Sequence, residues 1–304
     1  MAALAGAAKL TLVTGANGLV GSRIVARLQD SGAAVVAVGR GPRRAAGNFE
    51  YLDLDLRVPE KLAELIESLR PSGVIHAAAM TDVDACEKDP LDAWMLNVRA
   101  VEAAALACRC FSARLTALST DYVFDGEKGD YLEDDAPNPR GVYARTKRAG
   151  EEAALLLAPD VALCRVAVIY SGYQTLRRTF ASSAAESLRK GQPVKAFLDQ
   201  VVTPTLADNA AEMVIGVHRS GAQGIFHCAG ASAVTRVEFC RALARKLGAD
   251  EALIEPVRLA DLRLPAPRPL RSSLRTDKVR RLLGDGVPLP LDLALDRFLE
   301  EGRA

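Results

Sequence analysis

A chain of 304 residues, 49% of them hydrophobic, is long enough to bury a sizeable core, which excludes an intrinsically disordered protein. The 39 basic and 38 acidic residues give a formal net charge of +1, whereas a nucleic-acid or anionic-membrane partner usually requires a basic excess or a clustered basic stripe. No apolar run reaches the roughly 18 residues of a transmembrane helix, so we expect neither a nucleic-acid nor a membrane partner.

The N-terminus and the cysteines bear on the cellular compartment. The N-terminal stretch has no early basic region, and Gly15 and the Asn17-Gly18 pair interrupt its apolar run, which argues against a signal peptide. The six cysteines lie scattered in apolar stretches without C-x-x-C or zinc spacing. We therefore predict buried free thiols, no metal and a cytoplasmic location.

Short apolar runs alternate with helical patterns in the first part of the chain. Residues 10–15, 33–39 and 73–79 read as strands. Residues 18–31 and 59–69 read as helices, the second of them ending before Pro71.

The same alternation continues to residue 170. A long helix is expected near 90–110, a strand at 115–120, a helix at 141–157 and a strand at 161–170. Strands this uniformly apolar are covered on both faces, as in a parallel sheet. The pattern predicts an α/β fold, a doubly wound parallel Rossmann-type sheet.

Beyond residue 170 the pattern loosens. Helices are expected at 176–190, 206–218 and 235–248, and strands at 193–198 and 224–230. Six prolines between 256 and 290 predict a mostly irregular segment that lies over a surface.

These elements suggest two domains. The first, of residues 1–170 and 205–230, is expected to bind a dinucleotide. The second is a smaller discontinuous C-terminal lobe of residues 171–204 and 231–304, expected to bind the substrate.

A glycine-rich turn joins the first predicted strand to the first helix. Gly15, Gly18 and Gly21 are spaced G-x-x-G-x-x-G, one residue longer than the common dinucleotide fingerprint. Glycine lets the backbone approach a pyrophosphate, whose charge then meets the N–H groups of the helix N-terminus. The expected cofactor contacts here are Gly15, Asn17, Gly18, Leu19, Val20 and Gly21.

The residue after the second strand discriminates between the two nicotinamide cofactors. An acidic residue there would bind the ribose 2′-hydroxyl of NAD. This chain instead has Arg40, followed by Arg43 and Arg44, and no carboxylate before Glu50. Arginine suits a 2′-phosphate, so the sequence favours NADP, with NAD as the weaker alternative.

Three side chains form a candidate catalytic group. Tyr143 and Lys147 are four residues apart in a predicted helix and therefore share a face. Thr120 ends an apolar strand, and ligands of open α/β sheets bind at the carboxyl ends of the strands. A phenol with a free pKa near 10 can protonate a developing alkoxide when positive charge lies nearby.

With these residues the chain resembles the extended short-chain dehydrogenase/reductase superfamily, and within it the dTDP-4-dehydrorhamnose reductase family. The most specific stretch is STDYVFDGEKGDYLEDDAPNPRGVYARTKRAGEEA, residues 119–153. The resemblance implies NADPH-dependent reduction of a keto group, with a nucleotide-linked 4-keto-6-deoxysugar as substrate.

The resemblance also implies roles for individual residues. Thr120, Tyr143 and Lys147 would be the catalytic triad, Tyr143 donating the proton and Lys147 also binding the nicotinamide ribose. Further cofactor contacts would be Asp55, Leu56, Ala77, Ala78 and Ala79. The sugar would be bordered by Thr81, Val83, Thr120 and Tyr122, and Asn97 would be structural.

Several positions depart from the family pattern. Val168 stands where the family usually has tryptophan, Thr179 where it has asparagine, Arg275 where it has aspartate, and His76 where it has asparagine. The triplet Thr120-Asp121-Tyr122 lacks the glutamate of nucleotide-sugar dehydratases, which favours reduction over dehydration.

Other polar residues receive simpler interpretations. His76 and His227 lie in apolar strands and are expected to be core histidines. The acidic loop that begins at Asp121 is expected to be solvated. Arg268, Arg271 and Arg275 either meet a substrate diphosphate or belong to a solvated loop.

Two alternative functions remain open. One is a non-catalytic NADP-binding subunit resembling the regulatory subunit of methionine adenosyltransferase, and the other is a nucleotide-sugar epimerase. The expected partner is a small nucleotide sugar, and the chain could be a monomer or a homodimer.

Overall fold

A seven-stranded parallel sheet forms the centre of the computed structural model, which describes residues 9–44, 46–158, 160–173 and 178–302. Its strand order is β11-β6-β5-β4-β1-β2-β3, and each neighbouring pair is parallel. The strands are β1 (Thr11–Thr14), β2 (Val35–Gly39), β3 (Glu50–Asp53), β4 (Gly73–His76), β5 (Arg114–Thr120), β6 (Ala162–Val166) and β11 (Gly224–His227). The doubly wound α/β prediction is confirmed.

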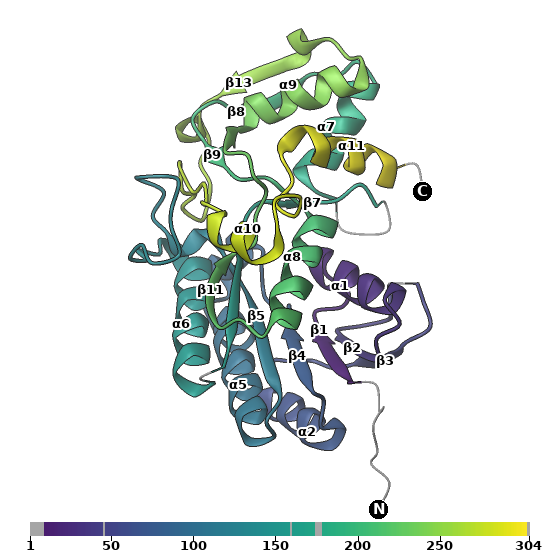
Figure 1. The fold of residues 1–304 in the computed structure, drawn as a ribbon. Coiled ribbons are helices and arrows are strands. Elements are labelled where there is room, and N and C mark those ends of the chain that lie inside the picture. Colours follow the sequence, from purple (N-terminus) through teal and green to yellow (C-terminus); the bar gives the residue numbers. More distant parts are fainter. Residues whose placement is uncertain (1–8, 45, 159, 174–177, 303–304) are drawn as a thin grey trace, which may run out of the picture.

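Helices cover both faces of this sheet (Figure 1). On one face lie α1 (Leu19–Asp30) and α8 (Ala207–Ser220), and on the other α2 (Pro59–Leu69), α5 (Ala100–Cys110) and α6 (Gly141–Leu157). The apolar positions of α1 recur every four residues, at Val20, Ile24 and Leu28, and all three are buried. The helices predicted at 18–31, 59–69 and 141–157 are confirmed.

Strand β3 escaped the sequence prediction. Its four residues are exposed or half-buried, because it lies at the edge of the sheet. Edge strands commonly carry charged side chains, so β3 lacks the apolar run that identified the other strands. Its register places Asp53 beside Gly39 at the end of β2.

The strand predicted at 161–170 is wrong in its second half. Strand β6 ends at Val166, and Ile169–Tyr170 form a separate strand, β7, which pairs with β10 (Thr205–Leu206). Between them Val168 has a φ of +42°, which a β-branched residue rarely adopts. This left-handed residue turns the chain out of the central sheet.

The long helix predicted near 90–110 begins as α4 (Pro90–Trp94), passes through a π-helical turn at Met95–Arg99 and continues as α5. Asn97 lies in the π turn and is fully buried. Its side chain pairs with both the N–H and the C=O of Met80, at 2.9 and 3.2 Å, and so fixes the segment that follows β4. A short helix, α3 (Val83–Lys88), follows that segment and was not predicted.

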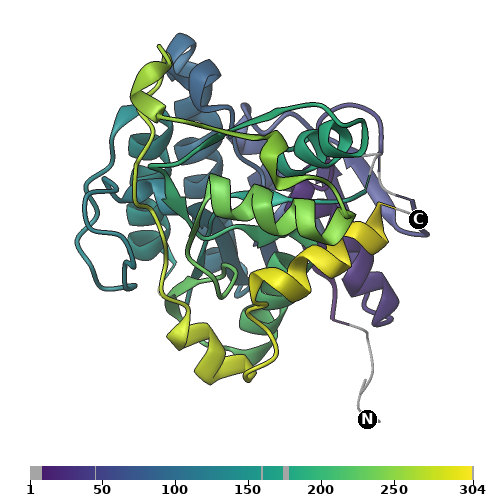
Figure 2. The ribbon, with the colours of Figure 1, turned by 90° about the horizontal axis from the view of Figure 1, so that it is seen from above.

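A smaller lobe packs around its own apolar core (Figure 1). It contains α7 (Phe180–Arg189), β8 (Val194–Phe197), α9 (Arg236–Leu247), β13 (Ile254–Val257) and α11 (Leu291–Glu301). Seen from above, α9 and α11 lie side by side (Figure 2). These elements are called the small lobe below; the domain boundaries given above stay a prediction.

The proline-rich segment is less irregular than expected. Residues 256–290 include the end of β13 and a further helix, α10 (Asp277–Leu283). Helix α11 follows it and was not predicted. Residues 174–177, which include the first two positions of the helix predicted at 176–190, lie outside the described residues, and the described helix there begins at Phe180.

The described residues lack a membrane-spanning helix and a metal-binding cluster, and their cysteines are unpaired. None of the helices there is both long and apolar enough to cross a membrane. Within the same residues no group of His, Cys, Asp or Glu is arranged to hold a metal ion. All six cysteines are free thiols, and five are buried as predicted; Cys110 is exposed, because it ends α5 on the outer side of the helix layer.

Candidate active site

The candidate residues lie at the carboxyl ends of the central strands. Because the strands are parallel, β1, β2, β4 and β5 present these ends at one edge of the sheet. The glycine turn follows β1, Arg40 follows β2, Ala77 follows β4, and Thr120 ends β5.

The glycine turn packs tightly against the segment after β4. Gly15 has a φ of +71°, and a Cβ there would lie 2.6 Å from the backbone N of Ala78. A Cβ on Gly21 would lie 2.1 Å from the carbonyl oxygen of Gly15. Both positions therefore require glycine, which brings the turn, the start of α1 and Ala77–Ala79 together.

The start of α1 offers unpaired amides. Its N-cap residue is Gly18, which has no side chain to accept a hydrogen bond from the first turn. The N–H groups of Leu19, Val20 and Gly21 consequently have no acceptor within the described residues, as expected for a first helical turn. Such a terminus fits a pyrophosphate, which would accept from these amides and meet the positive end of the helix dipole.

Asn17 ties the glycine turn to the loop after β2. Its amide nitrogen donates to the carbonyl oxygens of Arg40 and Pro42, each at 3.1 Å, and its oxygen accepts from the backbone N–H of Arg44 at 3.0 Å. The Asn17 side chain is therefore occupied in holding the backbone of the arginine-bearing loop, with the Arg40 side chain exposed at its start.

Two carboxylates lie near this loop. Asp53 accepts from the N–H of Gly41 at 2.8 Å. Asp55 pairs with Arg57, which also reaches Asp92 at 3.0 Å, and hydrogen bonding by Arg57 lowers the pKa of Asp55 to about 2. Leu56 is buried.

Thr120, Tyr143 and Lys147 all lie beside the last residues of β5. The Nζ of Lys147 donates to the carbonyl oxygen of Leu118 at 2.8 Å, two residues before Thr120. The Thr120 hydroxyl is close enough to the Tyr143 phenol to affect its ionisation. The rings of Tyr122 and Tyr143 meet edge to face with centroids 5.8 Å apart.

Burial dominates the ionisation of this group. It raises the pKa of Tyr143, with a smaller opposing effect from the Thr120 hydroxyl, so the phenol keeps its proton near neutral pH. Burial lowers the pKa of Lys147 to about 8, with Glu151 opposing that shift. The site thus presents a phenolic O–H donor and an ammonium ion at pH 7.

A buried ion pair lies one helical turn beyond Lys147. Glu151 accepts from Arg165 of β6 at 2.7 and 2.8 Å, and both side chains are almost completely buried. Arg148 adds a third contact at 3.1 Å. A cavity of about 10 Å³, the size of one water molecule, lies between Ser119, Lys147 and Glu151.

The residues expected to border the sugar are brought near Tyr143 to different degrees. Tyr122 contacts the Tyr143 ring directly, and burial raises the pKa of Tyr122 to about 12. Val83 begins α3 and is half-buried, and Thr81 is exposed on the loop before it.

Sequence reasoning misassigned two charged residues. Asp121, expected to be solvated, is buried because the segment between β13 and α10 covers it: Ser272 donates to it at 2.6 Å and Thr120 at 3.1 Å. Arg268, for which a diphosphate or solvent was expected, pairs with both carboxylate oxygens of Asp84 at 3.0 and 2.7 Å. The expectations for Arg271 and Arg275 stay open, with Arg271 exposed and Arg275 paired with Asp277.

The structure also brings Arg236 and Gln200 of the small-lobe side towards Asp121 and Tyr122. No sequence motif singled them out, because their positions depend on how the small lobe packs.

The histidines are core residues. His76 shares a hydrogen bond with Thr14 at 3.0 Å, and His227 with the carbonyl oxygen of Arg275 at 3.0 Å. Both are buried, as predicted, and burial lowers the pKa of each to about 3. They stay neutral near pH 7.

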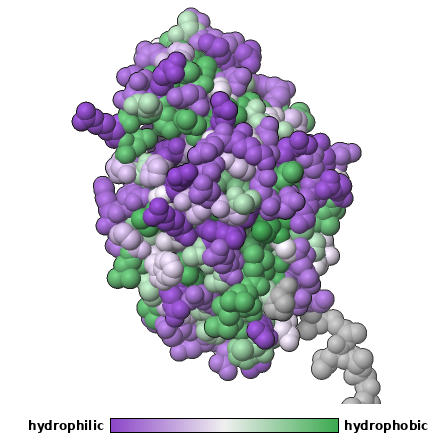
Figure 3. All heavy atoms as spheres, turned by 90° about the vertical axis from the view of Figure 1, so that its left-hand side faces the viewer, coloured by the Kyte–Doolittle hydropathy of each residue, from purple (hydrophilic) through white to green (hydrophobic). Residues whose placement is uncertain are grey.

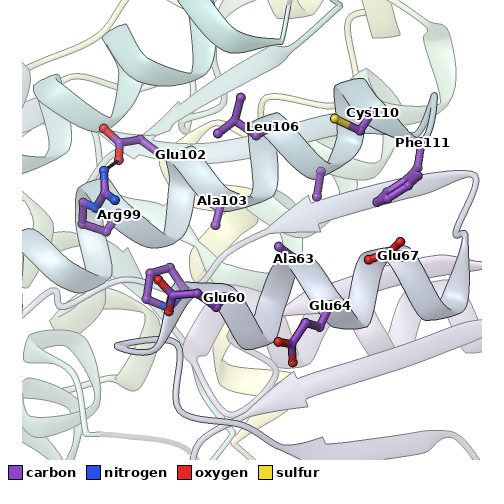
Figure 4. Close-up of a pocket in the computed structure, with 12 residues that line it drawn as sticks. Glu60, Ala63, Glu64, Glu67, Arg99, Glu102, Ala103, Leu106, Cys110 and Phe111 are labelled. Atoms are coloured by element: carbon purple, nitrogen blue, oxygen red, sulfur yellow. Dashed lines mark hydrogen bonds and ion pairs between the residues drawn. The ribbon is translucent and has the colours of Figure 1, made fainter.

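A separate groove of about 440 Å³ lies between α2 and α5 (Figure 4). Its walls carry Glu60, Glu64 and Glu67 from α2, and a pair between Arg99 of the π turn and Glu102 of α5. None of the candidate catalytic or cofactor residues lines it. The face on the left of Figure 1 is mostly hydrophilic, with apolar residues in separate patches (Figure 3).

Fold and site together define a Rossmann-type α/β protein with a Tyr-x-x-x-Lys pair at the carboxyl edge of its sheet. The family model described as RmlD substrate binding domain matches residues 9–303. The chain belongs to this family, the dTDP-4-dehydrorhamnose reductase family of the extended short-chain dehydrogenase/reductase superfamily.

Individual relatives agree with this assignment. The chain is 37% identical to a probable low-salt glycan biosynthesis reductase of Haloferax volcanii, over 93% of this chain and 95% of that protein. It is 32% identical to a dTDP-4-dehydrorhamnose reductase of Mycobacterium tuberculosis, over 89% and 86% respectively. The solved structure of a Yersinia enterocolitica dTDP-4-dehydrorhamnose reductase matches 97% of this chain and 99% of its own, with 26% identity and a TM-score of 0.85.

Proposed function

We propose that this protein reduces the keto group of a nucleotide-linked 4-keto-6-deoxysugar with NADPH. As a member of its family it is an NAD(P)-dependent oxidoreductase of the extended short-chain type. One observation supports the proposal: the Thr120 hydroxyl lies close to the Tyr143 phenol, and Lys147 reaches the same strand at Leu118, at the sheet edge that also presents the glycine turn.

Each of the three side chains has a distinct task in this proposal. The Thr120 hydroxyl hydrogen-bonds the substrate carbonyl and holds it in place. The Tyr143 O–H gives its proton to the carbonyl oxygen as negative charge develops there. The Lys147 ammonium stabilises the phenolate that remains.

The cofactor supplies the hydride when bound. The Leu19, Val20 and Gly21 amides would hold its pyrophosphate, and Lys147 its nicotinamide ribose. Arg40 would face the adenosine 2′-phosphate. Only NADP carries this phosphate, so we expect the protein to prefer NADP over NAD. Ala77–Ala79 and the Asp55-Leu56 pair would line the cleft.

The relatives support the proposed substrate class. Those named dTDP-4-dehydrorhamnose reductase or dTDP-4-keto-6-deoxy-D-glucose reductase support a nucleotide-linked keto sugar. Thr81, Val83 and Tyr122 would border that sugar. We further propose a cytoplasmic enzyme with a small-molecule partner.

Consumption of NADPH tests the proposal. Purified protein should oxidise NADPH when supplied with dTDP- or UDP-linked 4-keto-6-deoxysugars, and product analysis should show the corresponding hydroxyl sugar. Tight NADPH binding without turnover on the whole panel would favour the regulatory-subunit alternative. Conversion to an epimer without NADPH consumption would favour an epimerase.

A further inference from the structure

Arg236 reaches the candidate cleft from the small lobe. It is the first residue of α9, whose start is fixed by a capping box between Thr235 and Glu238. Phe239 and Cys240 anchor the same turn in the small-lobe core. The helix therefore holds the Cα of Arg236 in a defined place.

A hydrogen bond holds one edge of the Arg236 guanidinium group, and the described residues leave its other edge without an acceptor. Its Nε donates to the Gln200 side-chain oxygen at 3.2 Å, and the Gln200 amide in turn donates to the carbonyl oxygen of Pro269 at 3.1 Å. Its central carbon lies 5.1 Å from the centroid of the Phe180 ring. For the two terminal nitrogens, the described residues provide no acceptor.

This cation lacks the counter-ion that comparable arginines have. Arg165 pairs with Glu151 and Arg268 with Asp84, whereas no described carboxylate lies within ion-pair distance of Arg236. Burial lowers the pKa of Arg236, and Tyr122 and Asp121 oppose that shift from a distance without forming an ion pair with it. Buried charges are normally paired, which indicates that a ligand supplies the missing anion.

The location of Arg236 indicates which ligand supplies the anion. Arg236 interacts electrostatically with Tyr122, whose ring contacts the proposed proton donor Tyr143. The Asp121 carboxylate nearby already accepts hydrogen bonds from Ser272 and Thr120. An anion bound by Arg236 would thus belong to the molecule that occupies the cleft beside Tyr143.

We infer that Arg236 binds the diphosphate of the nucleotide-sugar substrate through its two free terminal nitrogens. A guanidinium fork matches two phosphate oxygens in one plane, and its weak hydration suits a partly buried site. The cofactor's pyrophosphate would instead meet the α1 amides on the other side of the cleft. This inference rests on the proposed function, since it names the group by which that substrate is recognised.

Replacement of Arg236 in the NADP-loaded protein tests the inference. R236Q should weaken binding of dTDP and UDP about 10- to 100-fold by calorimetry, because a charge-assisted pair is lost. R241Q, on an exposed position of the same helix, is the matched control and should bind as the wild type. NADPH affinity should stay unchanged in both variants.

A comparison of ligands isolates the phosphate contact. Thymidine and uridine lack the diphosphate, so R236Q should bind them as the wild type does, and R236K should fall between wild type and R236Q for dTDP. In turnover assays R236Q should raise KM by a similar factor with little change in kcat.

Two results would overturn the inference: unchanged dTDP and UDP affinity in a folded R236Q protein, or equal losses for nucleoside and nucleotide. If R236Q did not fold, R236K with full dTDP affinity would still count against the inference, since a point charge would then suffice. Loss of the proposed enzymatic function would look different, because dTDP or UDP binding would remain sensitive to R236Q although no keto sugar was reduced.

Discussion

Tyr143 and Lys147 carry the proposed chemistry through opposite responses to the same burial. Burial keeps the Tyr143 phenol protonated and makes the Lys147 ammonium lose its proton more readily. The first property suits Tyr143 to its proposed role as proton donor in the reducing direction. The second places the titration of Lys147 close to physiological pH.

Tyr143→Phe removes only the phenolic O–H. NADPH binding should be retained, and kcat should fall about 100- to 10,000-fold, the range over which general acids contribute. Stopped-flow turnover and cofactor titration on the same sample measure both quantities. Turnover equal to that of the wild type would refute the proton-donor assignment.

The pH profile should report Lys147. Its pKa is lowered to about 8, so the ammonium is present below pH 8 and is lost as the pH rises through that value. We expect kcat/KM to decline above pH 8 in the wild type. Lys147→Arg, which stays charged, should lack this alkaline decline at whatever rate it retains. A wild-type profile flat to pH 10 would contradict the assignment.

Substitutions of Arg40 and Asp53 should have opposite effects on which nicotinamide cofactor the protein prefers. Arg40→Ala should lower the affinity for NADPH about tenfold or more and leave the affinity for NADH nearly unchanged, because only NADPH has a 2′-phosphate. Asp53→Asn is the paired variant. If Asp53 bound the ribose hydroxyl of NADH, this substitution would lower the affinity for NADH instead. Equal effects of Arg40→Ala on both cofactors would remove the basis for the NADP preference.

At the scale of elements, α6 couples the active site to the sheet. Lys147 and Glu151 lie on one face of this helix, and Arg165 of β6 neutralises Glu151 in the core between them. A buried pair contributes little net stability by itself, but loss of one partner leaves a charge uncompensated. The pair therefore fixes α6, and with it Lys147, against β6.

Glu151→Gln should lower the free energy of unfolding by about 3–5 kcal/mol in urea denaturation, since Arg165 then lacks its counter-ion. Glu152→Gln is the control: Glu152 is the next residue, is mostly exposed and, among the described residues, pairs only with Arg148, so its loss should cost less than about 1 kcal/mol. Because Glu151 raises the pKa of Lys147, the alkaline limb of activity should also move to lower pH. Similar stabilities for the two variants would contradict a supporting role of the buried pair.

At the scale of the whole molecule, the candidate site is closed by contacts between segments far apart in sequence. Asp121 follows β5, and Ser272 lies 151 positions later in the segment between β13 and α10. Arg268 and Asp84 form a second such contact, at 184 positions. These contacts hold the segment between β13 and α10 against the carboxyl ends of the central strands.

Ser272→Ala should destabilise the protein in a pH-dependent way. Burial raises the pKa of Asp121 to about 6, so this carboxyl favours the folded state below its unfolded pKa near 4, and that contribution is lost as pH rises through 6. Without the Ser272 donor the ionised form is less well stabilised, and unfolding should cost about 1–3 kcal/mol less at pH 8, with a smaller loss at pH 5. Ser273→Ala, whose partner Asp130 is exposed, should show a small loss that is equal at both pH values.

The sequence by itself determined the sheet and most of its helices, and it supplied the candidate catalytic group. Apolar runs identify buried strands because both faces of a parallel strand are covered, and a four-residue spacing puts Tyr143 and Lys147 on one helix face. Strand β3 was missed because an edge strand is not apolar, and the break at Val168 because periodicity does not encode a left-handed residue.

Only the tertiary structure decided which charges are paired and which are open. Asp121 is buried by Ser272, Arg268 is neutralised by Asp84, and Arg236 is left with free donors, each through partners distant in sequence. Local patterns cannot specify such contacts, because solvation and pairing of a charge depend on packing between elements rather than on neighbours along the chain.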